Sequence, residues 1–311
     1  MKVLITGSSG FVAYYLALEL IHHQHQVILT AQEDGEMTIQ NTTYPILGIN
    51  LCDRAEVKKG LAHLEFDAVV HLAGISHLID AETDRKALAE VNIMGTNHLC
   101  CAIVERKIPC TFLLASSTVV FGHLLPPTKI FDENSPTNPI NPYGFSKLAA
   151  EAVVRCFDSS SFKTYIARPS NHIGMGQAPH FVCPSLARKI ALAPPGSAIE
   201  VGNLQSERDF CDVRDIARAY RLILEKQPDE SIFVLGQGQT ISIREILTIL
   251  IDLSGKNLHY KEVLNLKRSG EAEKIAINPS RAKIALGWEC QIPIKDSLKN
   301  ILEDAFGGTY A

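Results

Sequence analysis

Tyr143 and Lys147 are the residues whose types and spacing most directly suggest chemistry. They are four residues apart in a stretch with helical periodicity, so their side chains should share one face of a helix. A phenol has a pKa of about 10 and needs help to exchange a proton near neutral pH. A lysine one turn away favours the phenolate and should lower that pKa. Of the eight tyrosines, Tyr143 alone has this partner, so we favour proton transfer over a chance pair on a helix surface.

Ser117 is the third candidate for catalysis. It follows the apolar run 110–115, which is typical of a buried strand. Side chains at the carboxyl edge of a parallel sheet face the ligand crevice, so the Ser117 hydroxyl should reach the oxygen that reacts beside Tyr143. An isolated serine there would more simply cap the strand end. Together with Tyr143 and Lys147, it predicts a catalytic trio.

A glycine-rich turn near residue 7 predicts a dinucleotide site. The expected strand 2–6 leads to Gly7, which permits a tight turn, and to Gly10, which lets the backbone approach a pyrophosphate. The N–H groups at the start of the following helix would face the phosphates. A glycine pair alone is weak evidence, but its place between a strand and an amphipathic helix favours this interpretation. The expected cofactor contacts in this turn are Gly7, Ser9, Gly10, Phe11 and Val12.

The end of the second strand bears on which dinucleotide binds. NAD favours an acidic residue there, because a carboxylate holds the ribose 2′-hydroxyl. The chain has Ala31 and Gln32 at this point, no carboxylate before Glu33, and no arginine to meet a 2′-phosphate. Small polar residues tolerate a phosphate, so the pattern leans to NADP(H), and NAD(H) stays open. Gln32 is the expected contact.

Alternating elements must position these residues. Apolar strands that alternate with helices predict an α/β fold, a Rossmann-type doubly wound parallel sheet with a smaller C-terminal α/β substrate lobe. The dinucleotide-binding domain is expected to comprise residues 1–169 plus 212–236, and the substrate-binding lobe residues 170–211 plus 237–311. Trp288 is expected to pack the tail helix onto that lobe. The expected strands are 2–6, 26–30, 45–49, 67–72, 110–115, 163–167 and 231–235, and the expected helices are 10–23, 84–106, 143–157, 212–225, 242–253 and 295–305.

Composition excludes several classes of partner. Hydrophobic residues make up 46% of the 311 residues, and the net charge of −4 is spread without a basic cluster. Nucleic acids and membrane surfaces both require a clustered positive face, so neither is an expected partner. There is no leader-like segment or apolar run of membrane-spanning length, and the eight cysteines contain no C-x-x-C pair. We expect a cytoplasmic protein with reduced thiols and no metal.

Motifs along the whole chain resemble the extended short-chain dehydrogenase/reductase family, the nucleotide-sugar epimerases, dehydratases and reductases. The motifs are the Gly7/Gly10 turn, His71-Leu72-Ala73-Gly74, Asn92 with Gly95-Thr96, Ser117, Tyr143/Lys147 and Arg168-Pro169. The resemblance implies hydride transfer between nicotinamide C4 and a sugar carbon, with Tyr143 transferring the proton at the oxygen. It also implies cofactor contacts from Leu51, Leu72, Ala73, Gly74, Asn92, Ser116, Tyr143, Lys147 and Arg168.

The second half resembles one branch of that family, the GDP-4-keto-6-deoxy-D-mannose reductases and their relatives. The segments that carry it are 168–177, 181–182, 201–204 and 208–215. The resemblance implies that Asn171 and Arg208 reach the substrate pyrophosphate, that Arg268 contacts phosphate and that Glu271 contacts a ribose. Forked cationic donors suit a diphosphate. The further substrate contacts that it implies are Ser117, Thr118, Phe181, Val182, Val201 and Asn203.

Residues next to Ser117 separate the possible reactions. Sugar 4,6-dehydratases of the family carry an acidic pair just after the catalytic hydroxyl, where this chain has Thr118 and Val119. The fucose-forming epimerase-reductases use a cysteine and a histidine, where this chain has Thr118 and Phe181. What remains is hydride chemistry at C4, either NAD(P)H-dependent reduction of a 4-keto sugar or, alternatively, 4-epimerisation of a nucleotide sugar with bound NAD. The resemblance implies that the reduction converts GDP-4-keto-6-deoxy-D-mannose to GDP-D-rhamnose. A silent dinucleotide-sensing protein should have lost Tyr143 or Lys147. A homodimer through the Tyr143 helix and the preceding long helix is expected.

Overall fold

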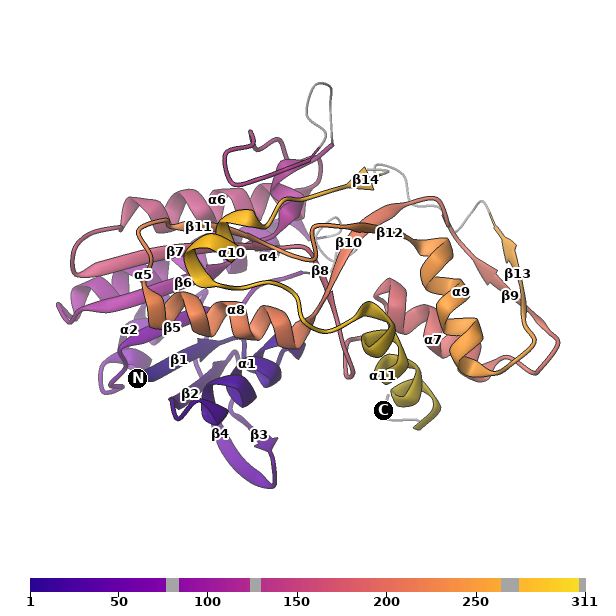
Figure 1. Cartoon of the computed structure of the whole chain (residues 1–311). Helices are drawn as coiled ribbons and strands as arrows, with labels where there is room; N and C mark the ends of the chain where they lie inside the picture. Colours follow the sequence, from indigo (N-terminus) through magenta and orange to yellow (C-terminus); the bar gives the residue numbers. More distant parts are fainter. Residues whose placement is uncertain (77–83, 124–129, 264–273, 308–311) are drawn as a thin grey trace.

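The computed structural model describes residues 1–76, 84–123, 130–263 and 274–307 of the chain. A large sheet flanked by helices forms one body, and a smaller lobe lies beside it (Figure 1). Within the described residues the main sheet has eight strands in the order β11-β7-β6-β5-β1-β2-β4-β3, all parallel except the β3–β4 pair. This confirms the Rossmann-type sheet. The strands are β1 (Lys2–Thr6), β2 (Gln26–Ala31), β3 (Gly35–Ile39), β4 (Thr42–Gly48), β5 (Ala68–His71), β6 (Cys110–Ala115), β7 (Phe162–Pro169) and β11 (Ile232–Leu235).

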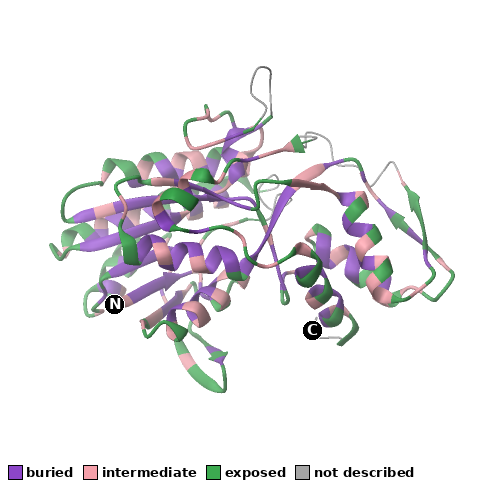
Figure 2. Ribbon diagram, viewed as in Figure 1, coloured by how far each residue is buried: buried purple, intermediate pink, exposed green. Residues whose placement is uncertain are grey.

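Both faces of this sheet are covered by helices. In β1, Val3 and Ile5 pack toward one face and Leu4 toward the other, as the two-residue period of a strand requires. The first face is covered by α1 (Phe11–His22) and α8 (Val213–Lys226), and the second by α2 (Arg54–Leu61), α5 (Thr96–Glu105) and α6 (Pro142–Cys156). The central strands are therefore buried along most of their length (Figure 2).

The long helix that precedes β6 is interrupted by a π-helical turn. It consists of α4 (Arg85–Ala89), η1 (Glu90–Gly95) and α5, and Asp84 caps its start by accepting a hydrogen bond from the Ala87 N–H at 2.8 Å. By length and composition alone this helix could cross a membrane, contrary to the expectation that the chain has no such run. Leu99 and Ile103 are buried in the core cluster between the sheet and α2, so it is a core helix of this fold.

After β10 (Glu207–Asp212) in the smaller lobe, the chain returns to the main sheet. β11 pairs with β7, and α8 packs against α1, so the 212–236 segment lies in the larger body. Helix α10 (Ser280–Leu286) and Trp288 belong to the same core, and the Trp288 indole N–H donates a hydrogen bond to the Asp215 carbonyl at 2.8 Å. The expectation that Trp288 packs onto the smaller lobe is therefore wrong. Residues 280–290 therefore lie with the larger body.

The smaller lobe has its own core. Helices α7 (Val182–Leu192), α9 (Ile243–Ser254) and α11 (Ile294–Gly307) bury leucine and isoleucine side chains against one another. Helix α9 begins with a capping box between Ser242 and Glu245 and ends at Gly255, which has φ +65°. The lobe strands are β8 (Asn171–Ile173), β9 (Ala198–Val201), β10 (Glu207–Asp212), β12 (Thr240–Ser242), β13 (His259–Glu262) and β14 (Lys274–Ile275). β10 pairs with β8, β12 and β14, and β13 pairs with β9.

Candidate active site

A cavity of about 1270 Å³ opens at the carboxyl ends of β1, β2, β5, β6 and β7 and continues into the smaller lobe. This is where ligands bind in doubly wound folds. It brings together most of the residues predicted from sequence. Those on its wall are Gly7, Ser9, Gly10, Phe11, Val12, Gln32, Leu51, Leu72, Ala73, Gly74, Ser116, Ser117, Thr118, Tyr143, Lys147, Asn171, Phe181, Val182, Val201, Asn203 and Arg208. Arg268 and Glu271 lie outside the described residues.

The glycine turn has the geometry that a pyrophosphate needs. Gly7 has φ +73°, and a Cβ there would lie 2.7 Å from the backbone N and Cα of Ala73, so only glycine fits. The Gly10 N–H donates to the Gly7 carbonyl at 2.9 Å, and Gly10 is the N-cap of α1. Without a side chain at that cap, the N–H groups of the first turn stay available to an anion. These residues fit a dinucleotide.

The rim next to Gln32 carries acidic side chains. A second hollow adjoins the cavity there, and it is lined by Gln32, Glu33, Asp34 and Glu36 along with residues of α1. The Asp34 carboxylate accepts the Gly48 N–H at 2.7 Å, which leaves Glu33 as the exposed carboxylate closest in sequence to Gln32. Among the described residues on this hollow's wall none is lysine or arginine. This charge pattern suits a ribose hydroxyl better than a 2′-phosphate, against the lean that the sequence suggested.

The catalytic trio meets on the cavity wall. Tyr143 is in the first turn of α6, which Asn141 caps by accepting the Gly144 N–H at 2.8 Å. Ser117 is the N-cap of the short 3-10 helix η2 (Thr118–Phe121), and its hydroxyl lies near enough to Tyr143 to lower the pKa of that phenol. The Lys147 Nζ donates to the Ala115 carbonyl at 2.9 Å and lies 5.9 Å from the Tyr143 ring centroid. The predicted spacing therefore produces one constellation.

The pKa of Tyr143 differs from the expectation. Burial raises the pKa of Tyr143 to about 12, and the neighbouring Ser117 hydroxyl opposes this only in part. Burial also lowers the pKa of Lys147 to about 8, opposed by the negative charge of Glu151. The sequence predicted that Lys147 would lower the pKa of Tyr143, and that was wrong for this state, because desolvation dominates. Tyr143 is thus a protonated phenol that is ready to donate.

Two predicted cofactor contacts lie behind the wall instead of on it. The Arg168 guanidinium donates to both Glu151 carboxylate oxygens, at 2.9 and 2.7 Å, and both side chains are buried. The Asn92 amide bonds the backbone N–H and carbonyl of Ile75 and the Ser146 hydroxyl. Since protein groups occupy these hydrogen bonds, Arg168 and Asn92 hold the wall in shape and are not among the residues that line the cavity.

Sequence reasoning missed the supports of this wall. Glu151 also accepts a hydrogen bond from Ser116, so it links Arg168 to the end of β6. Its spacing of four residues from Lys147 on one helix was the available signal. His71 bonds the Thr6 hydroxyl at 2.7 Å and the Thr96 hydroxyl at 2.9 Å, and burial lowers its pKa to about 3, so the imidazole is neutral.

The substrate half of the cavity combines cations with amides. Arg208 stands on β10, and its Nη1 donates to the Glu207 carbonyl at 2.9 Å. Asn171 begins β8 and donates to the Asp209 carbonyl at 3.3 Å. Lys189 of α7 also lines this half, although the sequence reasoning did not single it out. Two cations and an amide at one end of the cavity suit a diphosphate.

Helix α1 also supports the loop that follows β8. The Phe11 ring stacks on the His172 imidazole, with centroids 6.4 Å apart and planes 7° apart. The Tyr15 hydroxyl donates to the Met175 carbonyl at 2.8 Å. Burial lowers the pKa of His172, so the stacked imidazole is neutral. The cofactor turn and the substrate loop are therefore in direct contact.

Together, the glycine turn, the Ser-Tyr-Lys trio and the cationic half of the cavity define an NAD(P)-dependent enzyme of the extended short-chain dehydrogenase/reductase type, a class that acts on nucleotide sugars. The sequence profile of the GDP-mannose 4,6-dehydratase family matches residues 4–301. The chain belongs to that family.

Its relatives include reductases and dehydrogenases of deoxysugar nucleotides. The chain is 34% identical over 242 residues to GDP-6-deoxy-D-mannose reductase of Pseudomonas aeruginosa, a match covering 76% of this chain and 80% of the relative. It is 28% identical over 311 residues to GDP-6-deoxy-D-talose 4-dehydrogenase of Aggregatibacter actinomycetemcomitans, covering 98% and 97%. Its fold matches the solved structure of RMD from Pseudomonas aeruginosa complexed with NADPH, with a TM-score of 0.84, 30% identity, and 98% and 99% of the chains covered.

Proposed function

We propose that this protein is an NAD(P)H-dependent reductase of a nucleotide-linked 4-keto-6-deoxy sugar, with GDP-4-keto-6-deoxy-D-mannose as substrate and GDP-D-rhamnose as product. The observation that carries the proposal is the protonated Tyr143 phenol beside Ser117 on the wall of a cavity that also holds the glycine turn and Arg208. The name of the Pseudomonas aeruginosa relative supports the choice of substrate.

The proposed division of labour follows from these positions. The Gly7–Val12 turn and the start of α1 would hold the dinucleotide, which supplies a hydride to the sugar C4 when bound. As negative charge develops on the C4 oxygen, Tyr143 donates its proton there and Ser117 stabilises the same oxygen by a hydrogen bond. Lys147 is held toward Ala115 and would bind ribose hydroxyls.

The scarcity of carboxylates supports reduction over dehydration. Elimination of water from a sugar needs an acid and a base near the catalytic hydroxyl. Among the described residues that line the cavity, Glu90 is the one acidic side chain, and it belongs to η1, not to the segment after Ser117. Thr118 is buried and Val119 is apolar.

A 4-epimerase that retains NAD is the second candidate. The acidic rim at Glu33 favours it, because the 2′-hydroxyl of NAD suits a carboxylate there. An epimerase uses the same trio to oxidise and then reduce C4, so the trio does not separate the two reactions.

The deciding experiment supplies GDP-4-keto-6-deoxymannose with NADH or NADPH and follows nicotinamide absorbance. The proposal requires stoichiometric consumption of one reduced cofactor with formation of a 4-hydroxy sugar, and loss of this activity in Tyr143→Phe. If no reduced cofactor is consumed while nucleotide hexoses interconvert at C4 without added cofactor, the protein is an epimerase. Inactivity in both assays, with the Tyr143→Phe variant identical to wild type, would rule out both reactions.

We also propose a homodimer through η1, α5 and α6. Met94 and Phe145 are 46% and 58% exposed on this helical face, where large apolar side chains are costly in water. Light scattering should give the mass of a dimer, and the paired change Met94→Glu with Phe145→Glu should give the mass of a monomer.

A further inference from the structure

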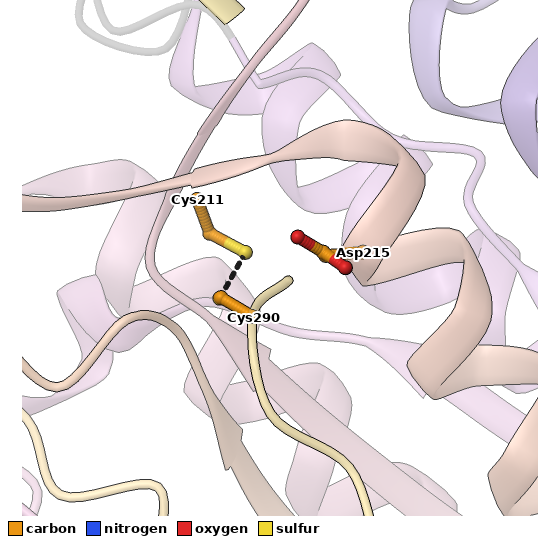
Figure 3. A group of neighbouring side chains, drawn as sticks. All are labelled: Cys211, Asp215 and Cys290. Atoms are coloured by element: carbon orange, nitrogen blue, oxygen red, sulfur yellow. Dashed lines mark hydrogen bonds between the residues drawn. The ribbon is translucent and has the colours of Figure 1, made fainter. Parts of the chain in front are cut away.

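Two cysteines from distant parts of the chain meet where the two bodies join. Cys211 is the penultimate residue of β10, and Cys290 lies in the segment between α10 and α11. Their sulfur atoms are 2.6 Å apart although 79 residues separate them along the chain. Figure 3 shows the pair with Asp215, from the first turn of α8, beside it.

The backbone around Cys290 is held in place by Asp215. One carboxylate oxygen accepts the N–H groups of Gln291 and Ile292, at 2.9 and 3.0 Å, and the other accepts a hydrogen bond from Arg218. Trp288 anchors the other side of Cys290 by its hydrogen bond to the Asp215 carbonyl. These hydrogen bonds therefore hold the backbone on both sides of Cys290 in place.

The same contacts argue against a metal ion in this cluster. Two thiolates on a tetrahedral zinc, with Zn–S of about 2.3 Å, would be roughly 3.8 Å apart. Both Asp215 oxygens are already engaged, and the Arg218 guanidinium that binds one of them would repel a cation. A covalent S–S bond, in contrast, requires only a small further approach of the sulfurs.

We propose that Cys211 and Cys290 are a reversible modification site that forms an intramolecular disulfide by exchange with a low-molecular-weight disulfide such as oxidised glutathione. Cys290 is partly exposed, so it reacts first with a disulfide from solvent, whereas Cys211 is 3% exposed. This proposal is independent of the substrate assigned above.

The exchange balances in two steps. The Cys290 sulfur attacks one sulfur of oxidised glutathione, which breaks that S–S bond, forms a mixed disulfide and releases one glutathione. Cys211 then attacks the Cys290 sulfur and releases the second glutathione, and the two thiol protons end on the two released molecules. Two cysteines are oxidised and glutathione disulfide is reduced. Burial raises the pKa of the Cys211 thiol, so the second step should be the slow one.

The bond would restrain the junction between the bodies. β10 carries Arg208 and Phe210 to the cavity wall, and the segment with Cys290 leads directly into α11 of the smaller lobe. A covalent link across this junction should raise the melting temperature and limit movement of the lobe relative to the sheet.

The test incubates the full-length protein in a series of glutathione redox buffers, blocks free thiols by alkylation and maps peptides by mass spectrometry. The expected result is a peptide pair joined through Cys211 and Cys290, with the mass loss of two hydrogens and a higher melting temperature, both reversed by dithiothreitol. Cys290→Ser should lose the cross-link and the redox dependence of melting. Cys156→Ser, which changes an exposed cysteine elsewhere, should keep both.

Three results would overturn the proposal. They are alkylation of both cysteines after full oxidation, cross-links that join either cysteine to another partner, or zinc that co-purifies in equimolar amount and is lost in Cys290→Ser. Should Cys290→Ser fold poorly, Cys290→Ala with its melting temperature measured in reductant serves as the second variant.

Discussion

The Arg168 guanidinium forms a two-pronged, buried ion pair with the Glu151 carboxylate, one turn of α6 beyond Lys147. The negative charge of Glu151 raises the pKa of Lys147 and opposes the effect of burial. Glu151 thus favours the charged ammonium of Lys147 in a desolvated site, although neither Glu151 nor Arg168 lines the cavity.

Glu151→Gln should therefore change both pH dependence and stability. Without the carboxylate, the pKa of Lys147 falls below about 8, so the alkaline loss of activity should move to lower pH. Arg168 would keep a buried charge without its partner, at a cost of about 3–5 kcal/mol in unfolding free energy. Rate profiles against pH and urea unfolding measure the two effects.

Glu105→Gln is the matched control for that change. Glu105 pairs with Arg54 and Lys58 at the surface, where solvent screens the ion pairs and their contribution to stability is small. The rate profile of Glu105→Gln against pH should equal that of the wild type. An unshifted alkaline limb in Glu151→Gln would contradict the proposed coupling to Lys147.

Tyr143→Phe should remove proton donation without removing the fold. We expect kcat to fall by about 10²–10⁴-fold, while the melting temperature and cofactor affinity change little. Tyr44→Phe, which removes a hydroxyl from β4 away from the cavity, should leave kcat unchanged. Steady-state kinetics measure the effect. A fall in kcat of less than tenfold would mean that another group donates the proton.

Gly7→Ala should abolish cofactor binding and cost about 1–3 kcal/mol of stability. Its Cβ would enter the backbone of Ala73, and its φ of +73° is unfavourable for alanine. Gly196→Ala has a similar φ of +80° but no atom within 4 Å of the new Cβ, so it isolates the backbone strain. Titration of the quenching of protein fluorescence by NADH measures binding. Equal losses of NADH affinity in the two variants would mean that the close approach of residue 7 to Ala73 is unimportant.

Glu33→Arg should shift cofactor preference toward NADPH. The change replaces a carboxylate on the acidic rim by a cation that can pair with a 2′-phosphate. A new ion pair of about 1.4 kcal/mol corresponds to roughly tenfold in the ratio of kcat/KM for NADPH over NADH. Glu230→Arg makes the same charge change at an exposed site away from the rim and should leave the ratio unchanged.

The parts of the site that the sequence could predict depend on local rules. A strand, a glycine turn and a helix follow one another between residues 2 and 22, and the i, i+4 spacing brings Tyr143 and Lys147 to one face. Parallel strands share an edge, so Ser117 could be placed beside them before any contact was known.

The remainder depends on contacts that local patterns do not contain. The sequence could not show which of the two hydrophobic cores Trp288 packs into, because a buried indole is equally compatible with either core. The high pKa of Tyr143 arises from burial by surrounding elements. The β3–β4 hairpin was missed because its turn uses Gln40 and Asn41 at positive φ, where Asn-Gly is the usual signal.

The stacking of Phe11 on His172 makes α1 a common support for both halves of the cavity. Packed rings barely compress, so a displacement of the first turn of α1 would be passed on to β8, which carries His172. A phosphate group bound at that turn and a substrate held beside β8 would therefore rest on elements that pack directly against each other.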